Sequence, residues 1–219
     1  MNRRNFIKVA GIAGGTLAVR EGAGAIITKN MESNKSVVAI NGSPNEGGNT
    51  AYALSLVGKE LEKEGIAFEV IHIGNKRIRG CMACNNCVEK GQCIHTNEQE
   101  KAWVDKMKKA DAIILASPVY FGGIAGTMKS FLDRIFFAYS DAFRGKIGVS
   151  LVTARRSGAS VTFAGLNQYL TISQMIVPSS VYWNNIHATV KEEIADDKEG
   201  VQIMQTLGKN VAALLIKGI

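Results

Sequence analysis

The 219-residue sequence lacks the short motifs that would assign it at once to a large functional class. It has neither the G-x-x-x-x-G-K-[ST] loop that binds nucleoside triphosphates nor the G-x-G-x-x-G spacing that binds dinucleotides. No Ser-His-Asp triad and no pair of carboxylates stands out, and internal repeats are absent. The three histidines, His72, His95 and His187, stand apart from any metal-like spacing, so we interpret them as structural or surface residues.

The composition excludes two broad classes of protein. Hydrophobic residues make up 46% of the chain and charged residues 21%, so neither a disordered chain nor a bundle of membrane helices is indicated. A chain of 219 residues suits one α/β domain with a full hydrophobic core. We therefore expect one globular domain without a stable membrane span.

The first residues resemble a twin-arginine export signal. Arg3 and Arg4 precede an apolar run, residues 9–19, that is too short to span a bilayer, and the small residues Ala23-Gly24-Ala25 follow. We expect a signal peptide at 1–25, a polar linker at 26–35 and the domain at 36–219. The resemblance implies export to the periplasm or another extracytoplasmic space. The alternatives are an ordinary basic helix or an uncleaved anchor, and a cytoplasmic location if the signal does not function.

The net charge of +7 includes four basic residues and one acidic residue in the first 25 positions, so removal of this segment leaves +4. Short basic clusters remain at 76–79, 106–109 and 155–156. They suit a phosphorylated cofactor or an acidic redox partner. Because no basic module interleaved with aromatic residues accompanies them, we do not expect nucleic acid to bind.

Apolar strand patterns alternate with helical patterns from residue 36 onward, which is typical of βαβ units. The strands are predicted at 36–40, 68–73, 112–116, 147–152 and within 175–183. Helical spacing predicts helices at 54–61, 98–109, 124–136, 160–170 and 201–214. The order predicts a doubly wound, five-stranded parallel sheet with helices on both faces. Ligands bind such sheets beyond the carboxyl ends of the strands.

The loop after the first strand has the composition of a phosphate cradle. Its sequence, Asn41-Gly-Ser-Pro-Asn-Glu-Gly-Gly-Asn-Thr50, runs straight into a helix. Glycines let the backbone approach an anion, and the start of a helix offers free N–H groups. The candidate ligands of a phosphate monoester are Ser43, Asn45, Asn49, Thr50 and Ala51. The alternative is a Gly/Asn turn with a threonine helix cap.

The loops after the third and fourth strands lie at the same predicted edge. The first of them places two aromatic residues beside glycines, which suits a flat heteroaromatic ring, although both aromatics also suit a core. Its candidate contacts are Pro118, Val119, Tyr120, Phe121 and Gly122. The other loop contributes the candidates Thr153, Arg155 and Gly158. Its arginines suit a phosphate of a cofactor or cosubstrate, or a solvated surface.

All four cysteines lie in one insertion, residues 80–96, between the second strand and the next helix. Cys81, Cys84, Cys87 and Cys93 have the spacing C-x2-C-x2-C-x5-C. Thiolates two residues apart can converge on one cluster, so we interpret them as ligands of an iron-sulfur centre. Disulfides, which have three connectivities, and tetrahedral zinc are the alternatives.

Several of these stretches together resemble the NADPH-dependent FMN reductase and iron-sulfur flavoprotein families, which have a flavodoxin-like fold. The resemblance covers residues 36–217 and includes Gly42-Ser-Pro-Asn45, Gly48-Asn-Thr50, Ser117 to Gly122 and Asp133-Arg134. It implies FMN phosphate on residues 43–51, the isoalloxazine ring against 118–122, and further ring contacts from 153–158. It also implies that the cysteines carry a 4Fe-4S cluster.

The expected function is that of an FMN-dependent oxidoreductase of the NAD(P)H:flavin/acceptor reductase type, which relays electrons through the cysteine centre. Its expected partners are NAD(P)H or a redox protein donor, a small-molecule acceptor, and further copies of itself in a dimer or tetramer. The cysteines are expected beside the flavin, from the same or a neighbouring subunit. The alternatives are a flavodoxin-like electron carrier without its own turnover and a binding module that has lost flavin.

Overall fold

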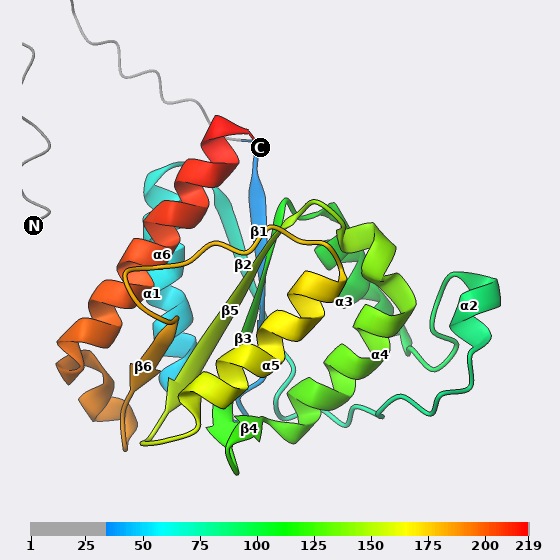
Figure 1. Ribbon diagram of the computed structural model, residues 1–219, viewed down its shortest axis with the longest axis horizontal. Helices are drawn as coiled ribbons and strands as arrows, with labels where there is room; N and C mark the ends of the chain where they lie inside the picture. Colours follow the sequence, from blue (N-terminus) through cyan, green and yellow to red (C-terminus); the bar gives the residue numbers. More distant parts are fainter. Residues whose placement is uncertain (1–33, 219) are drawn as a thin grey trace, which may run out of the picture. The chain divides into compact units, whose positions relative to one another are not determined.

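The computed structural model describes residues 34–218, so the predicted signal peptide, 1–25, and the linker up to residue 33 lie outside the described residues. A parallel sheet lies between two layers of helices (Figure 1). Its strands are β1 (Ser36–Asn41), β2 (Ala67–His72), β3 (Ala112–Tyr120), β4 (Gly123–Ile124), β5 (Ile147–Ala154) and β6 (Asn185–His187). The helices are α1 (Asn49–Lys63), α2 (Asn86–Lys90), α3 (Glu98–Lys109), α4 (Gly126–Phe143), α5 (Ala159–Ile172), the 3-10 helix η1 (Lys191–Asp196) and α6 (Lys198–Lys217).

The sheet has the strand order β2-β1-β3-β5-β6, and every pair along this path is parallel. The strand order reverses direction at β1, which lies between β2 and β3. The two-residue strand β4 pairs antiparallel with the end of β3 and lies off this path. The prediction of a doubly wound sheet with five parallel strands is therefore confirmed.

Each face of the sheet has its own hydrophobic core, because side chains alternate along a strand. Val38 and Ile40 of β1 pack into the core beneath α3, α4 and α5. Val37 and Ala39 of the same strand pack into the core beneath α1 and α6. The central strand β3 is buried on both faces, which explains its uninterrupted apolar sequence from Ala112 to Ala116.

The best-predicted element is α3, whose observed bounds coincide with the predicted 98–109. A capping box fixes its start: Asn97 accepts a hydrogen bond from the backbone N–H of Glu100, whose carboxylate accepts one from the N–H of Asn97. Among the described residues, no helix is long and apolar enough to cross a bilayer.

The position predicted for the fifth strand, within 175–183, was wrong. Ile176 forms only an isolated bridge with Ile147, and the strand β6 follows at Asn185–His187. The apolar residues that suggested a strand, Val181 to Trp183, are exposed. Buried asparagines precede and begin the real strand, and the Asn184 side chain donates to the carbonyl oxygen of Ser150. This buried segment carries polar side chains that a hydrophobic pattern does not reveal, and Asn184 Oδ1 has no hydrogen-bond partner among the described residues.

Candidate functional site

The loop after β1 is held in a compact turn by its own polar side chains. Asn41 Oδ1 accepts a hydrogen bond of 3.0 Å from the backbone N–H of Ser43. Ser43 Oγ in turn accepts one of 3.2 Å from the N–H of Asn45, and the carbonyl of Asn45 accepts one from Gly48. These three hydrogen bonds hold a loop rich in asparagine, serine and glycine in one conformation.

The end of β2 and the residues that follow it contact this loop. A Cβ atom on Gly74 would lie 1.9 Å from the carbonyl oxygen of Ser43, so only glycine permits this approach. His72 Nε2 lies 2.6 Å from the same carbonyl, which can only accept, so Nε2 carries the hydrogen. His72, which the sequence predicted as a structural or surface residue, thus contacts the candidate phosphate loop.

The loop after β1 with the start of α1, the ends of β3 and β5, and the segment after β6 line one pocket of about 440 Å³ at the carboxyl edge of the sheet. This volume lies within the range that small-molecule sites occupy. The structure brings nine of the predicted contacts into its wall: Ser43, Asn45, Asn49, Thr50, Pro118, Val119, Tyr120, Thr153 and Arg155. The hydroxyls of Thr50 and Thr153 lie 2.8 Å apart and join the first turn of α1 to the end of β5. We name this cavity the edge pocket.

Four other predicted contacts lie outside this wall. Ala51 is half-buried in the first turn of α1, and Phe121 and Gly122 line a neighbouring pocket of about 230 Å³ with Arg155 and two residues after it. Phe121 is fully exposed and has a left-handed φ of 48°. Gly158, with φ of 91°, lies so close to Val119 that a Cβ there would approach its side chain to 2.8 Å.

The edge pocket has the features that an FMN phosphate and ribityl chain require. The N-cap of α1 is Gly48, which supplies no side-chain hydrogen bond, and the first turn contains no acidic residue. Its backbone N–H groups are therefore available to an anion. Asn49 Oδ1 is buried without a hydrogen-bond partner among the described residues, so this acceptor suits a ligand hydroxyl, and the NH2 group of the same side chain suits a phosphate oxygen.

Sequence reasoning missed the contribution of the loop after β6. Ala188, Thr189, Val190 and Lys191 complete the wall of the edge pocket. Lys191 Nζ lies 3.7 Å from where a Cβ on Gly47 would stand, which places a cation over the candidate phosphate loop. Ligands bind such sheets beyond the carboxyl ends of the strands. The sequence would therefore have predicted Lys191 as a contact if the fifth strand had been placed at its observed position.

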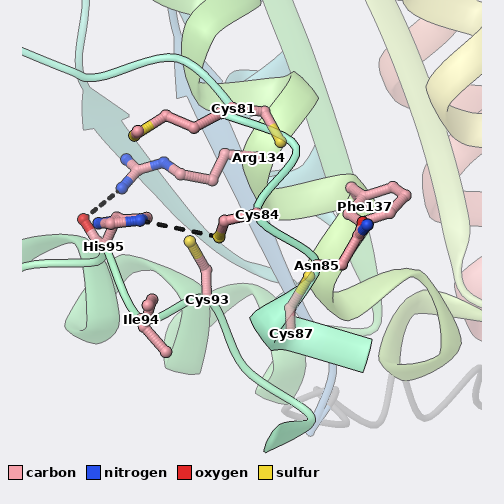
Figure 2. A pocket seen from close by; sticks show the side chains of 10 residues that line it. Cys81, Cys84, Asn85, Cys87, Cys93, Ile94, His95, Arg134 and Phe137 are labelled. Carbon is pink, nitrogen blue, oxygen red and sulfur yellow. Dashed lines mark hydrogen bonds between the residues drawn. The ribbon is translucent and has the colours of Figure 1, made fainter. Parts of the chain in front are cut away.

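The four cysteines are free thiols and together line a second pocket, the cysteine pocket (Figure 2). Its other lining residues are Met82, Asn85, Ile94, His95, Arg134 and Phe137. Cys84 Sγ lies 3.8 Å from His95 Nε2. Within residues 34–218, no group of three or more histidine, cysteine or acidic residues is arranged closely enough to hold a metal ion.

The backbone and donor set of the cysteine pocket nevertheless suit a metal-sulfur centre. Four thiols share one wall, as such a centre requires. Ala83 and Asn85, on either side of Cys84, have left-handed φ angles of 52° and 56°, and turns of this kind form concavities for anions in many iron-sulfur sites. Hydrogen bonds from the side chain and backbone of Asn86 lower the pKa of the Cys84 thiol, which favours the thiolate that binds metals.

The cysteines differ in how firmly the fold holds them. Cys93 is half-buried, and its N–H donates a hydrogen bond of 3.2 Å to the Tyr139 hydroxyl of α4. Cys81 and Cys84 lie on an exposed loop. No residue lines both the cysteine pocket and the edge pocket, and α2 with its flanking loop lies beyond α4 (Figure 1). Proximity of the cysteines to a flavin therefore remains a prediction.

Comparison with known families and sequences gives consistent results. Residues 36–189 match the family described as NADPH-dependent FMN reductase. An iron-sulfur flavoprotein of Methanocaldococcus jannaschii is 32% identical over 187 residues, which are 82% of this chain and 96% of that protein.

Solved structures share the fold at lower identity. A flavodoxin from the domain Archaea has a TM-score of 0.56 at 18% identity, and the match covers 83% of this chain and 99% of the flavodoxin. An NADH:FMN oxidoreductase in its apo form has a TM-score of 0.54 at 23% identity, with 80% and 88% covered. These similarities establish the flavodoxin-like fold.

Proposed function

Because this chain belongs to the NADPH-dependent FMN reductase family, we propose that it is an oxidoreductase that holds FMN in the edge pocket and uses NAD(P)H or a redox protein as its electron donor. The observation that carries the proposal is that segments at the carboxyl ends of β1, β3, β5 and β6 converge on one cavity, whose wall includes the uncapped start of α1 and Tyr120. Bound FMN supplies the hydride and electron-transfer chemistry, and the protein supplies binding and orientation.

The residues of the edge pocket divide into two groups by chemistry. The first turn of α1, with Ser43, Asn49 and Thr50, offers hydrogen-bond donors for the phosphate, and Lys191 supplies the positive charge that the loop itself lacks. Pro118, Val119 and Tyr120 form an apolar wall for the isoalloxazine ring, and Ala51, Phe121, Gly122, Thr153, Arg155 and Gly158 remain proposed contacts.

The cysteine pocket supports the finer proposal of a 4Fe-4S cluster that exchanges electrons with FMN. The four thiols hold the cluster in this proposal, as the spacing and the resemblance to iron-sulfur flavoproteins lead us to expect. Since the two pockets share no residue, we propose that a dimer or tetramer places the cysteines of one subunit near the flavin of another. The exposed Phe121 beside one pocket and the exposed Cys81 and Cys84 in the other suit such an interface.

Steady-state turnover tests the proposed function directly. Protein purified anaerobically with FMN should oxidise NADPH, NADH or a reduced redox protein when a quinone or free flavin is the acceptor. Protein stripped of flavin should lose the activity, and FMN should restore it. A protein that binds FMN but shows no turnover with any of these donors is an electron carrier, and the enzymatic proposal then fails.

We also propose that the first 25 residues export the protein, because paired arginines precede a short apolar run. Replacing Arg3 and Arg4 with lysine should leave the protein inside the cells and prevent its appearance in the extracytoplasmic fraction. FMN content and folding of the retained protein should be unchanged, since the domain begins at residue 36. Unaltered export of the double variant in cell fractionation would show that the signal is misread.

A further inference from the structure

Arg134 is the most deeply buried cation of the described chain, and it stands in the middle of α4. Only 2% of its surface is exposed. Burial of a guanidinium is costly unless its charge and its N–H groups find partners. Each hydrogen-bond donor of the Arg134 side chain therefore needs a partner.

Two of the three nitrogens of the Arg134 guanidinium have partners. Nη2 forms an ion pair with the carboxylate of Glu100, which is itself buried. Nη1 donates a hydrogen bond of 2.5 Å to the carbonyl oxygen of His95. Glu100 is fixed in turn by the capping box of α3. Arg134 thus links α4 to α3 and to the chain segment that follows Cys93.

The third nitrogen, Nε, differs from the other two. Nε of Arg134 is buried and makes no hydrogen bond among the described residues. An unsatisfied donor on a buried cation is costly, and such groups in native proteins often mark a ligand site. Arg134 also lines the cysteine pocket, where Figure 2 shows its guanidinium reaching toward His95.

The guanidinium of Arg134 brings a positive charge, paired with the Glu100 carboxylate, to the wall of that pocket. Among the described residues that line it, Arg134 is the one with a permanent charge. Thiolate ligands and a metal-sulfur centre are anionic, and the centre becomes more negative by one charge when it accepts an electron. Hydrogen bonds to the sulfurs and nearby charge are the main means by which a protein sets the potential of such a centre.

We propose that Arg134 is a positioning residue of the cysteine pocket whose Nε–H donates to a cysteine thiolate or sulfide and raises the reduction potential of the centre. The inference rests on the proposed cluster and names the residue that tunes it. Glu100 orients the guanidinium and offsets part of its charge. If Arg134 used only the ion pair and the His95 contact, loss of Nε–H in Arg134→Lys, which keeps the charge, would leave the potential of a bound centre unaffected.

Anaerobic redox titration of the iron-loaded protein, followed by absorption and electron paramagnetic resonance, tests the inference. Arg134→Gln should lower the equilibrium constant for one-electron reduction of the cluster by about tenfold, a shift of about 59 mV to more negative potential. Arg134→Lys, which keeps the charge but removes Nε–H, should give a smaller loss of about threefold. The FMN potential should stay constant in both variants and serves as an internal reference.

Arg144→Gln on the same helix is the matched control, because this exposed arginine pairs with Asp141 away from the cysteines. A cluster potential that is unchanged in Arg134→Gln overturns the inference and leaves the proposed cluster intact. If Arg134→Gln does not fold, an unchanged potential in Arg134→Lys overturns it equally. Wild-type protein that takes up no iron on reconstitution overturns the proposed cluster itself, and the inference fails with it.

Discussion

Simultaneous replacement of Ser43, Asn49 and Thr50 by alanine, alanine and valine should weaken FMN binding by about 100-fold. The three side chains line one wall of the edge pocket, where each is in a position to bond the phosphate or ribityl chain. Hydrogen bonds to charged groups contribute about 1.5–3 kcal/mol each, but the backbone N–H groups at the start of α1 remain and keep part of the affinity. Fluorescence titration of the flavin-free protein measures the loss.

Riboflavin separates phosphate contacts from ring contacts in the same titration. Lys191→Gln should weaken FMN binding by less than about tenfold, because the lysine is exposed and screened by solvent. Lys191→Gln should leave riboflavin binding unchanged, since riboflavin has no phosphate.

The matched control for the triple variant is Ser160→Ala with Thr171→Val, which removes two exposed hydroxyls on α5 and should bind FMN normally. Wild-type affinity in the triple variant would mean that the edge pocket does not hold the phosphate.

The sequence predicted the fold well where periodicity and turn chemistry agree. Alternating strand and helix patterns predicted five parallel strands and placed four of them correctly. Because ligands bind beyond the carboxyl ends of such strands, three candidate loops were then placed at one edge. Their convergence in the edge pocket depends on the strand order, with β1, β3 and β5 adjacent. A sequence shows this order only through the family resemblance, because pairing between strands is a long-range property.

The features that the sequence did not reveal depend on contacts between distant segments. Lys191 reaches the phosphate loop from the far end of the sheet, and the misplaced fifth strand hid it. The sequence marks Arg134 only through the family resemblance, and its burial follows from its partners on α3 and after Cys93. Burial and hydrogen-bond satisfaction of a charged residue are properties of tertiary structure, so helical spacing alone does not predict them.

Replacing Cys84 with serine should reduce the iron content by about tenfold or more relative to flavin, because a hydroxyl is a much poorer ligand of iron than a thiolate. Cys84 is exposed, so the free energy of unfolding of the metal-free domain should change by less than about 0.5 kcal/mol. FMN binding should be unaffected, since no residue lines both pockets. Broad visible absorption beneath the flavin bands should disappear together with the iron.

Three measurements on the wild-type protein and this variant separate the chemistries that four cysteines allow. Met82→Leu, which alters a neighbouring side chain of the same pocket, is the control and should keep its iron. Elemental analysis measures iron and zinc together. One zinc ion per chain in the wild-type protein would indicate a tetrahedral zinc site instead of the cluster. Thiol titration under denaturing conditions detects disulfides. Wild-type protein with little metal and no titratable thiols would make the cysteines a disulfide framework, and electron relay through this pocket would then be excluded while the edge pocket keeps its proposed role.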